Sequence, residues 1–178
     1  PLDGTKEFIK GSGQFSVNIA FVKKRKPVLG VIYIPMTGDI FFSDGEKKAF
    51  RENKRTNSQK TLLKINKKPN FDSSIRVVTS KDHLDRETEL FLGSFESYKT
   101  IKMGSSIKFC LLSEGKAEVY PRKRPTMEWD TAAGHAILCA SGGRVIDLST
   151  NKELIYGKKG YKNNSFIAYS ERRKFNLI

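Results

Sequence analysis

The sequence has few cysteines, a deficit of acidic residues and no long hydrophobic run. Its two cysteines, Cys110 and Cys139, stand apart from any Cys-x-x-Cys or Cys-His grouping, so neither a cysteine metal site nor a redox pair is predicted. Both lie in apolar helical patterns, and we expect two buried free thiols. The longest apolar run, around residues 28–34, is far shorter than the ~20 residues of a membrane span.

The first residues lack the charged and apolar segments of a secretion signal. Without such a signal or a membrane span, we expect a protein of the cytoplasm, either free there or peripheral on the inner membrane. The oligomeric state is expected to be a monomer or a homodimer.

The acidic deficit gives the chain a strongly positive charge. There are 33 Lys and Arg against 19 Asp and Glu, for a net charge of +14 and a pI near 9.8. Such a field attracts polyanions and small anions. The basic residues are scattered, mostly lysines, and not interleaved with aromatic stacking platforms, which favours a generally basic surface over a nucleic-acid groove. No nucleic acid is expected as a partner, although a basic nucleic-acid-binding protein remains an alternative interpretation.

The residues that are present fit a folded protein. With 178 residues, 38% hydrophobic and 29% charged, the chain is long enough for one ordinary domain or two small lobes with a buried core. We therefore look for secondary structure in the hydrophobic pattern.

The first part of the chain predicts an antiparallel sheet. Residues 15–21 alternate between apolar and polar, as in a half-buried strand. Asp44-Gly45 is a hairpin signal between two later strands. Pro69 and several lysines indicate a linker over 66–73. The strands predicted after 15–21 are 28–34, 39–43, 47–51 and 62–65.

The second part alternates between strand and helix patterns. The residues Leu84, Thr88, Phe91 and Leu92 share one face of a helical segment, and Gly115 and Gly142 mark two helix ends. Alternation of this kind predicts a parallel or mixed sheet. The fold class is therefore α/β (α+β), with an antiparallel lobe over 1–70 and an α/β lobe over 74–178. Strands are predicted over 75–79, 98–103, 117–120, 144–148 and 165–169, and helices over 105–113 and 131–140.

Two stretches carry carboxylates that could serve a site. In Asp3-Gly4-Thr5, the glycine lets backbone amides approach an anion and the threonine adds a hydroxyl, although this turn is also common without function. Trp129-Asp130 precedes the small residues 131–134 at the beginning of a predicted helix. Asp130 suits a metal ligand there, or it serves only as the N-cap.

Two further stretches carry polar and basic groups. Residues 103–108, Met-Gly-Ser-Ser-Ile-Lys, lie at a strand-to-helix junction, where the serines either bind an anion or cap the helix. Residues 120–124, Tyr-Pro-Arg-Lys-Arg, hold guanidinium groups that suit phosphate, although they also fit an ordinary basic loop.

Taken together, these motifs resemble the bacterial 3′(2′),5′-bisphosphate nucleotidases of the inositol monophosphatase-like superfamily of magnesium-dependent phosphatases. The family's first signature, Asp-Pro-(Leu/Ile)-Asp-Gly-Thr, is similar to residues 1–5, and Lys6-Glu7-Phe8-Ile9 continues it as in the nucleotidase branch. The second signature, Trp-Asp-x-Ala-Ala-Gly, is similar to residues 129–134. The resemblance implies a layered αβαβα sugar-phosphatase-like fold.

The resemblance also implies an activity, namely removal of the 3′-phosphate of 3′-phosphoadenosine 5′-phosphate to give AMP, in sulfur assimilation and nucleotide recycling. Hard carboxylate oxygens suit Mg²⁺, which activates water for attack on phosphorus. Asp3 and Thr5 are implied as catalytic residues. The implied metal ligands are Asp3, Asp130 and the carbonyl of Leu2, and the implied substrate contacts are Leu2, Asp3, Gly4, Thr5, Ser105, Lys108, Arg122 and Asp130.

The sequence departs from the family pattern at its beginning. The family has an aspartate immediately before the position of Pro1 and a glutamate pair further upstream, neither of which the 178 residues include. We therefore interpret the chain as a truncated, cleaved or incompletely recorded member that lacks the leading helices. We expect very low activity from these residues alone and an apolar face exposed on the antiparallel sheet. An inositol monophosphatase-type sugar phosphatase and a catalytically dead remnant are the remaining alternatives.

Overall fold

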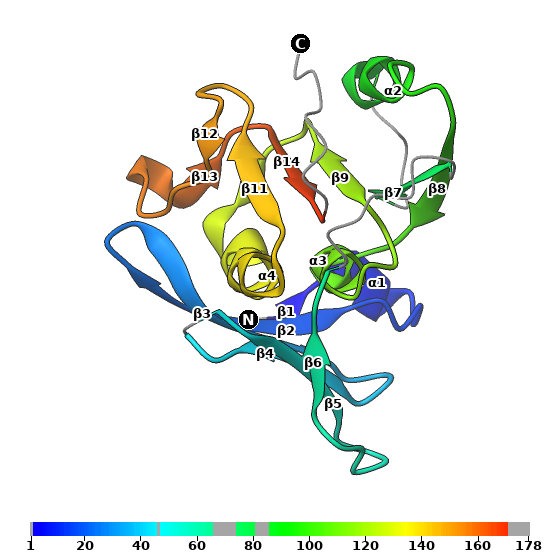
Figure 1. Cartoon of the computed structure of the whole chain (residues 1–178), viewed down its shortest axis with the longest axis vertical. Coiled ribbons are helices and arrows are strands. Elements are labelled where there is room, and N and C mark those ends of the chain that lie inside the picture. The colour runs from blue at the N-terminus through cyan, green and yellow to red at the C-terminus, as the bar shows by residue number, and fades with distance from the viewer. Residues whose placement is uncertain (1, 46, 66–73, 81–85, 171–178) are drawn as a thin grey trace.

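The structure, a computed structural model, describes residues 2–45, 47–65, 74–80 and 86–170. These residues form successive layers: a first sheet, a pair of helices, a second sheet and one more helix (Figure 1). Over the described residues, this order agrees with the corresponding layers of the implied αβαβα fold. The predicted linker over 66–73 lies outside the described residues, and the division into lobes at 70 and 74 remains a prediction.

The first sheet contains six described strands, each antiparallel to its neighbours and arranged in chain order. The predicted meander is confirmed, and the strand over 39–43 has the predicted bounds. The strand expected at 47–51 instead begins at Ala49, because Lys48 belongs to the turn and its N–H donates to Oδ1 of Asp44 at 3.1 Å. The strands are β1 (Leu2–Asp3), β2 (Ser16–Lys23), β3 (Lys26–Ile34), β4 (Asp39–Ser43), β5 (Ala49–Asn53) and β6 (Thr61–Leu63).

The inner face of this sheet packs against the helices α3 (Ile107–Ser113) and α4 (Glu128–Ser141). Ile32 and Phe41 of the sheet are buried with Cys110 of α3 in one cluster. The backbones approach closely at Gly30, where a β-carbon would lie 2.2 Å from the carbonyl oxygen of Ala133. Only glycine fits at this contact between sheet and helix.

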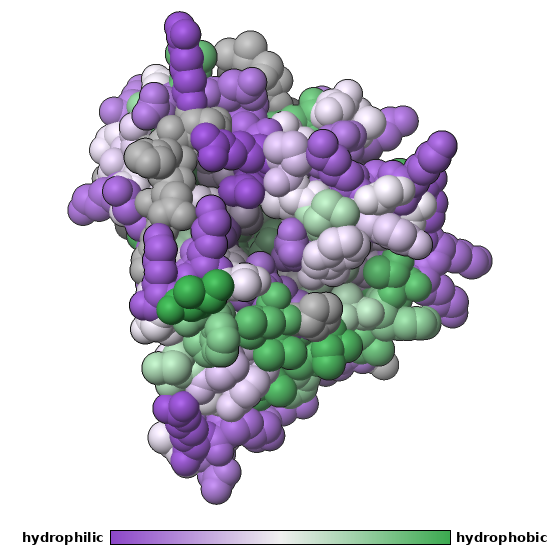
Figure 2. Space-filling model, turned by 180° about the vertical axis from the view of Figure 1, so that it is seen from behind, coloured by the Kyte–Doolittle hydropathy of each residue, from purple (hydrophilic) through white to green (hydrophobic). Residues whose placement is uncertain are grey.

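The outer face of the first sheet is apolar and exposed, as predicted. Ile19, Phe21 and Leu62 are 63%, 55% and 51% exposed. Leu29 lies opposite Phe21 on the neighbouring strand and is also exposed. Figure 2 shows hydrophobic side chains gathered over the lower part of the molecule, the level at which Figure 1 places this sheet.

The second sheet is mixed, as the alternating pattern predicts. Strand β7 (Ile75–Thr79) is parallel to β8 (Tyr98–Lys102) and to β9 (Val119–Arg122), whereas the remaining pairs are antiparallel. The predicted bounds 75–79 are confirmed. The order of the sheet is completed by β14 (Phe166–Tyr169), β11 (Arg144–Asp147) and β12 (Lys152–Glu153), and a separate ribbon pairs β10 (Thr126–Met127) with β13 (Lys162–Asn163).

The helix α2 (Arg86–Leu92) covers the outer face of the second sheet. Leu92 is fully buried and Phe91 packs against the same cluster, as the predicted face requires, while Leu84 lies outside the described residues. The inner face packs on α3 and α4 through Phe109 and Phe166, whose rings stack at 6.2 Å. The remaining helices are α1 (Thr5–Ile9) and a 3₁₀ turn, Lys159–Tyr161.

Two predicted helix starts require correction. The helix expected from residue 105 begins at Ile107, because Ser105 has a left-handed backbone with φ of 56°. The helix expected from residue 131 begins at Glu128, so Asp130 lies inside its first turn and is not the N-cap. Gly142, with φ of 110°, ends this helix as predicted.

The prediction for the cysteines is half correct. Cys110 is buried, as expected, but Cys139 is exposed because it lies on the side of α4 turned away from the core. Both are free thiols. In the described part of the chain, no helix is long and apolar enough to cross a membrane.

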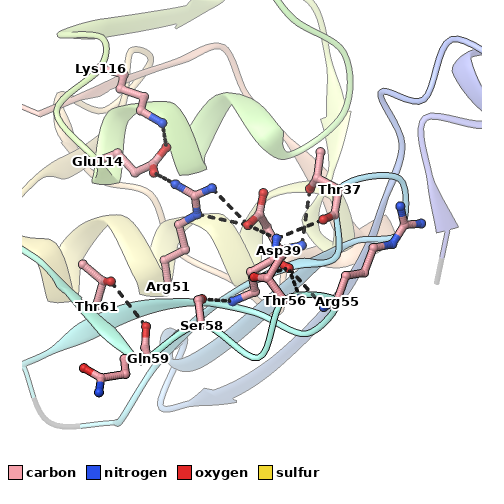
Figure 3. A network of polar contacts seen from close by, with 11 residues as sticks. Thr37, Asp39, Arg51, Arg55, Thr56, Ser58, Gln59, Thr61, Glu114 and Lys116 are labelled. Atoms are coloured by element: carbon pink, nitrogen blue, oxygen red, sulfur yellow. Dashed lines mark hydrogen bonds and ion pairs between the residues drawn. The ribbon is translucent and has the colours of Figure 1, made fainter.

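A polar network joins the first sheet to the end of α3 (Figure 3). The guanidinium of Arg51 donates to Oδ1 of Asp39 at 3.0 Å and to Oε1 of Glu114 at 2.8 Å. Asn53 also donates to Asp39, at 2.9 Å. Both carboxylate side chains are only 10% exposed, so this network links two layers through largely buried charges.

Candidate active site

A polar cavity of about 290 Å³ lies where the first sheet meets the helical layer and the second sheet. Its walls come from the turn after β1, the ends of β7 and β9, the junction before α3, and the start of α4. Most of the predicted site residues line it, namely Asp3, Gly4, Ser105, Lys108, Arg122 and Asp130. Leu2 and Thr5 are next to these in sequence but do not line the cavity.

Asp3 is held by the junction that precedes α3. Its Oδ2 accepts the backbone N–H of Ser106 at 2.6 Å. The Ser106 hydroxyl in turn donates to Oδ1 of Asn18 at 2.7 Å and contacts Oγ of Ser16 at 2.8 Å. The Ser106 side chain therefore does not cap α3. It binds to β2 instead, while the Ser106 backbone N–H holds the carboxylate of Asp3.

Asp130 faces the same cavity from the first turn of α4. Its Oδ2 accepts the N–H of Met127 at 2.9 Å. Burial raises the pKa of Asp130, and the negative charge of Asp3 raises it further. The two carboxylates, 127 positions apart in the sequence (130 − 3), are therefore close enough to interact electrostatically.

This pair suits a hard divalent cation. Each carboxylate uses Oδ2 for a backbone N–H, and no hydrogen bond within the described chain occupies either Oδ1. Mg²⁺ is commonly held by one or two carboxylates with water and substrate phosphate completing its shell. In the part of the chain described, no group of three or more metal-ligating side chains comes together, so the protein supplies few ligands here.

Lys108 brings a buried positive charge to the cavity. Its Nζ donates to the carbonyl oxygens of Ser105 at 2.7 Å and Met103 at 3.3 Å. Burial lowers the pKa of Lys108 to about 8, and the charge of Arg122 also lowers it, whereas Asp3 raises it. An anion bound in the cavity would therefore stabilise the charged form of Lys108.

Arg122 also lines the cavity and has one donor that lacks a partner among the described residues. Its Nη1 donates to Oγ of Ser80 at 2.9 Å, but its Nε is buried without a hydrogen-bond partner among the described residues. The hydroxyl of Thr79 is buried in the same way. Buried donors without partners are costly, so an anionic ligand here would satisfy them.

No site role was predicted for Glu7, Thr79 or Ser80, all of which line the cavity. Arg124, from the basic stretch 120–124 that was predicted to suit phosphate, also lines it. Thr79 and Ser80 stand at the carboxyl end of β7, the end of a parallel strand where ligands commonly bind. The position of Thr79 and Ser80 at the end of a β-branched run was therefore the feature of the sequence that could have identified them as site residues. Residues 120–122 belong to β9 and not to a loop, which fixes the direction of Arg122.

A buried network supports the beginning of α4. Thr131 accepts hydrogen bonds from Asn163 at 2.9 Å and from the hydroxyl of Tyr156 at 3.2 Å. Tyr156 also contacts Nδ1 of His135 at 3.0 Å. Burial lowers the pKa of His135 to about 3, so this histidine is neutral and structural.

The arrangement therefore combines two interacting carboxylates with buried cationic groups around one cavity. Carboxylates can hold a cation, while Lys108 and Arg122 can bind anionic oxygens. Such a combination is suited to a phosphate ester with a second anionic group.

Comparisons with known proteins agree with this chemistry. The 3′(2′),5′-bisphosphate nucleotidase CysQ of Escherichia coli K12 is 44% identical over 147 residues, which are 83% of this chain and 56% of that protein. The CysQ of Buchnera aphidicola from Acyrthosiphon pisum is 43% identical over 145 residues, 82% of this chain and 52% of that protein. The chain therefore spans about half the length of these curated relatives.

Solved structures show the same fold. The crystal structure of CysQ from Bacteroides thetaiotaomicron matches with a TM-score of 0.86 and 38% identity, covering 97% of this chain and 69% of that one. An inositol monophosphatase from Zymomonas mobilis matches with a TM-score of 0.77 at 23% identity, covering 97% and 64%. The sequence profile described as "Inositol monophosphatase family" matches residues 1–177. The chain belongs to the inositol monophosphatase family.

Proposed function

We propose that the cavity is the site of a magnesium-dependent phosphomonoesterase that acts on 3′(2′),5′-bisphosphate nucleotides. The proposed reaction removes the 3′-phosphate of 3′-phosphoadenosine 5′-phosphate and gives AMP and phosphate. The observation that carries the proposal is that Asp3 and Asp130 share one cavity with Lys108 and with Arg122, whose Nε has no hydrogen-bond partner among the described residues. The names of the nucleotidases that are 44% identical favour the same substrate class over inositol phosphates.

Metal ions serve this family, and Mg²⁺ is the ion we propose here. Asp3 and Asp130 would hold it through their carboxylates, and Leu2 would add its backbone carbonyl. When bound, the ion supplies positive charge to the phosphoryl oxygens and lowers the pKa of water. The two carboxylates are orientated for this task by the N–H groups of Ser106 and Met127.

The remaining residues would position the nucleotide. Gly4, whose φ is 88° and which lines the cavity, would present its backbone amide to the scissile phosphate. Thr5, which follows it outside the cavity lining, would have to add its hydroxyl from the edge of the site. Lys108 and Ser105, which line the cavity, would contact the sugar or the second phosphate, and Arg122 would provide a guanidinium for that phosphate. Binding would satisfy the Nε of Arg122, which costs free energy while it has no partner.

The residues of this chain alone should bind the metal weakly, since its described cavity offers two closely interacting carboxylates. We therefore expect slow turnover from the 178 residues by themselves. A cytoplasmic location and a monomeric or homodimeric state remain predictions.

Phosphate release from 3′-phosphoadenosine 5′-phosphate, compared with release from an inositol monophosphate, tests the proposal. We expect slow release that requires Mg²⁺, favours the nucleotide and disappears in Asp130→Asn, because that change removes a ligand charge. Glu96→Gln, on an exposed residue outside the cavity, should retain the rate. Unchanged release in Asp130→Asn, or preference for the inositol phosphate, would contradict the proposed function.

A further inference from the structure

Glu7 is a carboxylate in the cavity for which the proposed mechanism has no role. It belongs to α1, is half-buried and lines the same cavity as Asp3 and Lys108. A negative charge in a site for an anionic substrate opposes phosphate binding nearby. Its position therefore calls for a partner that is not a phosphate.

The side chain of Glu7 occupies a space that two glycines leave open. A β-carbon on Gly104 would lie 2.9 Å from Cγ of Glu7 and 3.1 Å from its Oε1. A β-carbon on Gly4 would lie 3.3 Å from Oε2. The carboxylate is thus placed between the Asp3-Gly4-Thr5 turn and the junction that carries Ser105 and Lys108.

The Glu7 carboxylate has no hydrogen bond or ion pair with the other residues that the structure describes. The one hydrogen bond that Glu7 accepts from a side chain, from Ser12 at 3.3 Å, goes to its backbone oxygen. The neighbouring amide of Gly104 is already taken by Oε1 of Gln14 at 2.9 Å. Both oxygens of Glu7 are therefore available to a ligand.

The chemistry of a carboxylate limits what that ligand group can be. A carboxylate accepts hydrogen bonds only, so its partner must carry a donor, and the neutral donors that a nucleotide offers are hydroxyl and amino groups. Glu7 is not favoured as a third metal ligand, because within the described chain it does not form a ligand group with Asp3 and Asp130. A hydroxyl next to the scissile phosphate is the donor that this location would meet first.

We propose that Glu7 accepts a hydrogen bond from the ribose hydroxyl vicinal to the scissile phosphate, which is the 2′-hydroxyl when the 3′-phosphate is removed. This inference rests on the proposed function. Glu7 lies between the turn assigned to the scissile phosphate and the residues assigned to the rest of the nucleotide, where the sugar would lie. Glu7 is then a specificity-determining residue that distinguishes ribonucleotides from deoxyribonucleotides.

Equilibrium binding of 3′-phosphoadenosine 5′-phosphate and of its 2′-deoxy analogue, measured by calorimetry with Ca²⁺ in place of Mg²⁺, tests this role. The unaltered chain should bind the ribonucleotide about tenfold more tightly, as a hydrogen bond to a charged group permits. Glu7→Ala should lose that preference by weakening only the ribonucleotide. Glu7→Gln keeps one acceptor oxygen and should retain part of the preference, while Glu96→Gln should retain all of it.

The comparison between two ligands on one variant separates recognition from folding, because a damaged fold weakens both. Equal weakening of both ligands in Glu7→Ala and Glu7→Gln would overturn the inference. So would an unaltered chain that binds the two ligands equally, and in that case the proposed function stands. If the unaltered chain binds neither bisphosphate, the proposed function fails and this inference fails with it.

Discussion

Lys108 is a buried cation whose ionisation should respond to substrate. Its pKa of about 8 in the free protein is set mainly by burial, and Asp3, Glu7 and Asp130 oppose the lowering. A bound phosphate stabilises the ammonium form of Lys108 and raises its pKa. Binding therefore takes up a proton when the pH is above the pKa of Lys108 in the free protein. Affinity should then fall as pH rises.

We expect the affinity for 3′-phosphoadenosine 5′-phosphate to fall by up to about tenfold per pH unit above a pH of about 8. Calorimetry in buffers of different ionisation enthalpy measures both the affinity and the proton uptake. Lys108→Met should bind more weakly and with a flatter pH dependence, whereas Lys54→Met, on the surface, should keep the original profile. A Lys108→Met profile as steep as that of the unaltered chain would contradict this account.

At this scale the sequence identified the residues that carry recognisable chemistry in short motifs. Asp3 and Asp130 were noticed as carboxylates in short polar motifs, and the family resemblance of those motifs, not either motif alone, implied their role. Glu7 and Thr79 were not identified as site residues, because neither belongs to a motif that differs from the pattern of its own helix or strand. Their role depends on the contact between segments about 70 to 100 positions apart, which only folding creates.

Among the elements, the network around Arg51 should be the strongest polar link between the first sheet and α3. Removing the guanidinium leaves Asp39 and Glu114 as largely buried carboxylates without their cation. We expect Arg51→Met to lower the free energy of unfolding by about 2 kcal/mol, measured by urea denaturation.

Lys54→Met is a matched control, because it removes an ion pair with Glu52 whose side chains are 51% and 26% exposed. Its effect should be within about 1 kcal/mol. If Arg51→Met costs no more than this control, the network does not link the layers energetically.

Predictions of elements succeeded where the local pattern dominates. The strands 39–43 and 75–79 have the expected bounds because each is a continuous β-forming run closed by turn residues. The start of α4 was not predictable in this way. Glu128 joins the helix while its carboxylate accepts the N–H groups of Gly157 at 2.7 Å and Lys158 at 3.0 Å, contacts made about 30 residues away.

Across the whole molecule, the exposed outer face of the first sheet and the net charge of +14 act in opposite directions on association. The apolar face favours contact between molecules, and like charge opposes it. Salt screens the repulsion, with a Debye length near 10 Å at 0.1 M. Light scattering should therefore show association that increases with salt concentration.

The double variant Ile19→Thr with Phe21→Thr should suppress this association, because it replaces two exposed side chains of the face with residues that still favour strands. A control change on the same molecule, Leu90→Thr, removes an exposed apolar side chain of α2 and should leave association unchanged. Association that falls as salt is added would instead indicate contacts between charges.

The antiparallel first sheet and the mixed second sheet were predictable because the change from meander to alternating strands and helices is visible along the chain, whereas the layered arrangement was implied only by the family resemblance. What the sequence did not provide was the close fit of the layers, such as the contact of Gly30 with Ala133. That fit places the start of α4 beside the turn after β1 and so brings the two carboxylates together.

The most direct test of the central claim, that Asp3 and Asp130 act on one divalent cation, is a titration with Mn²⁺ followed by electron paramagnetic resonance, with Mg²⁺ as competitor. We predict weak binding that Mg²⁺ displaces, that phosphate strengthens, and that either Asp3→Asn or Asp130→Asn abolishes. Binding that survives both single changes, or that each change weakens independently of the other, would contradict a shared site.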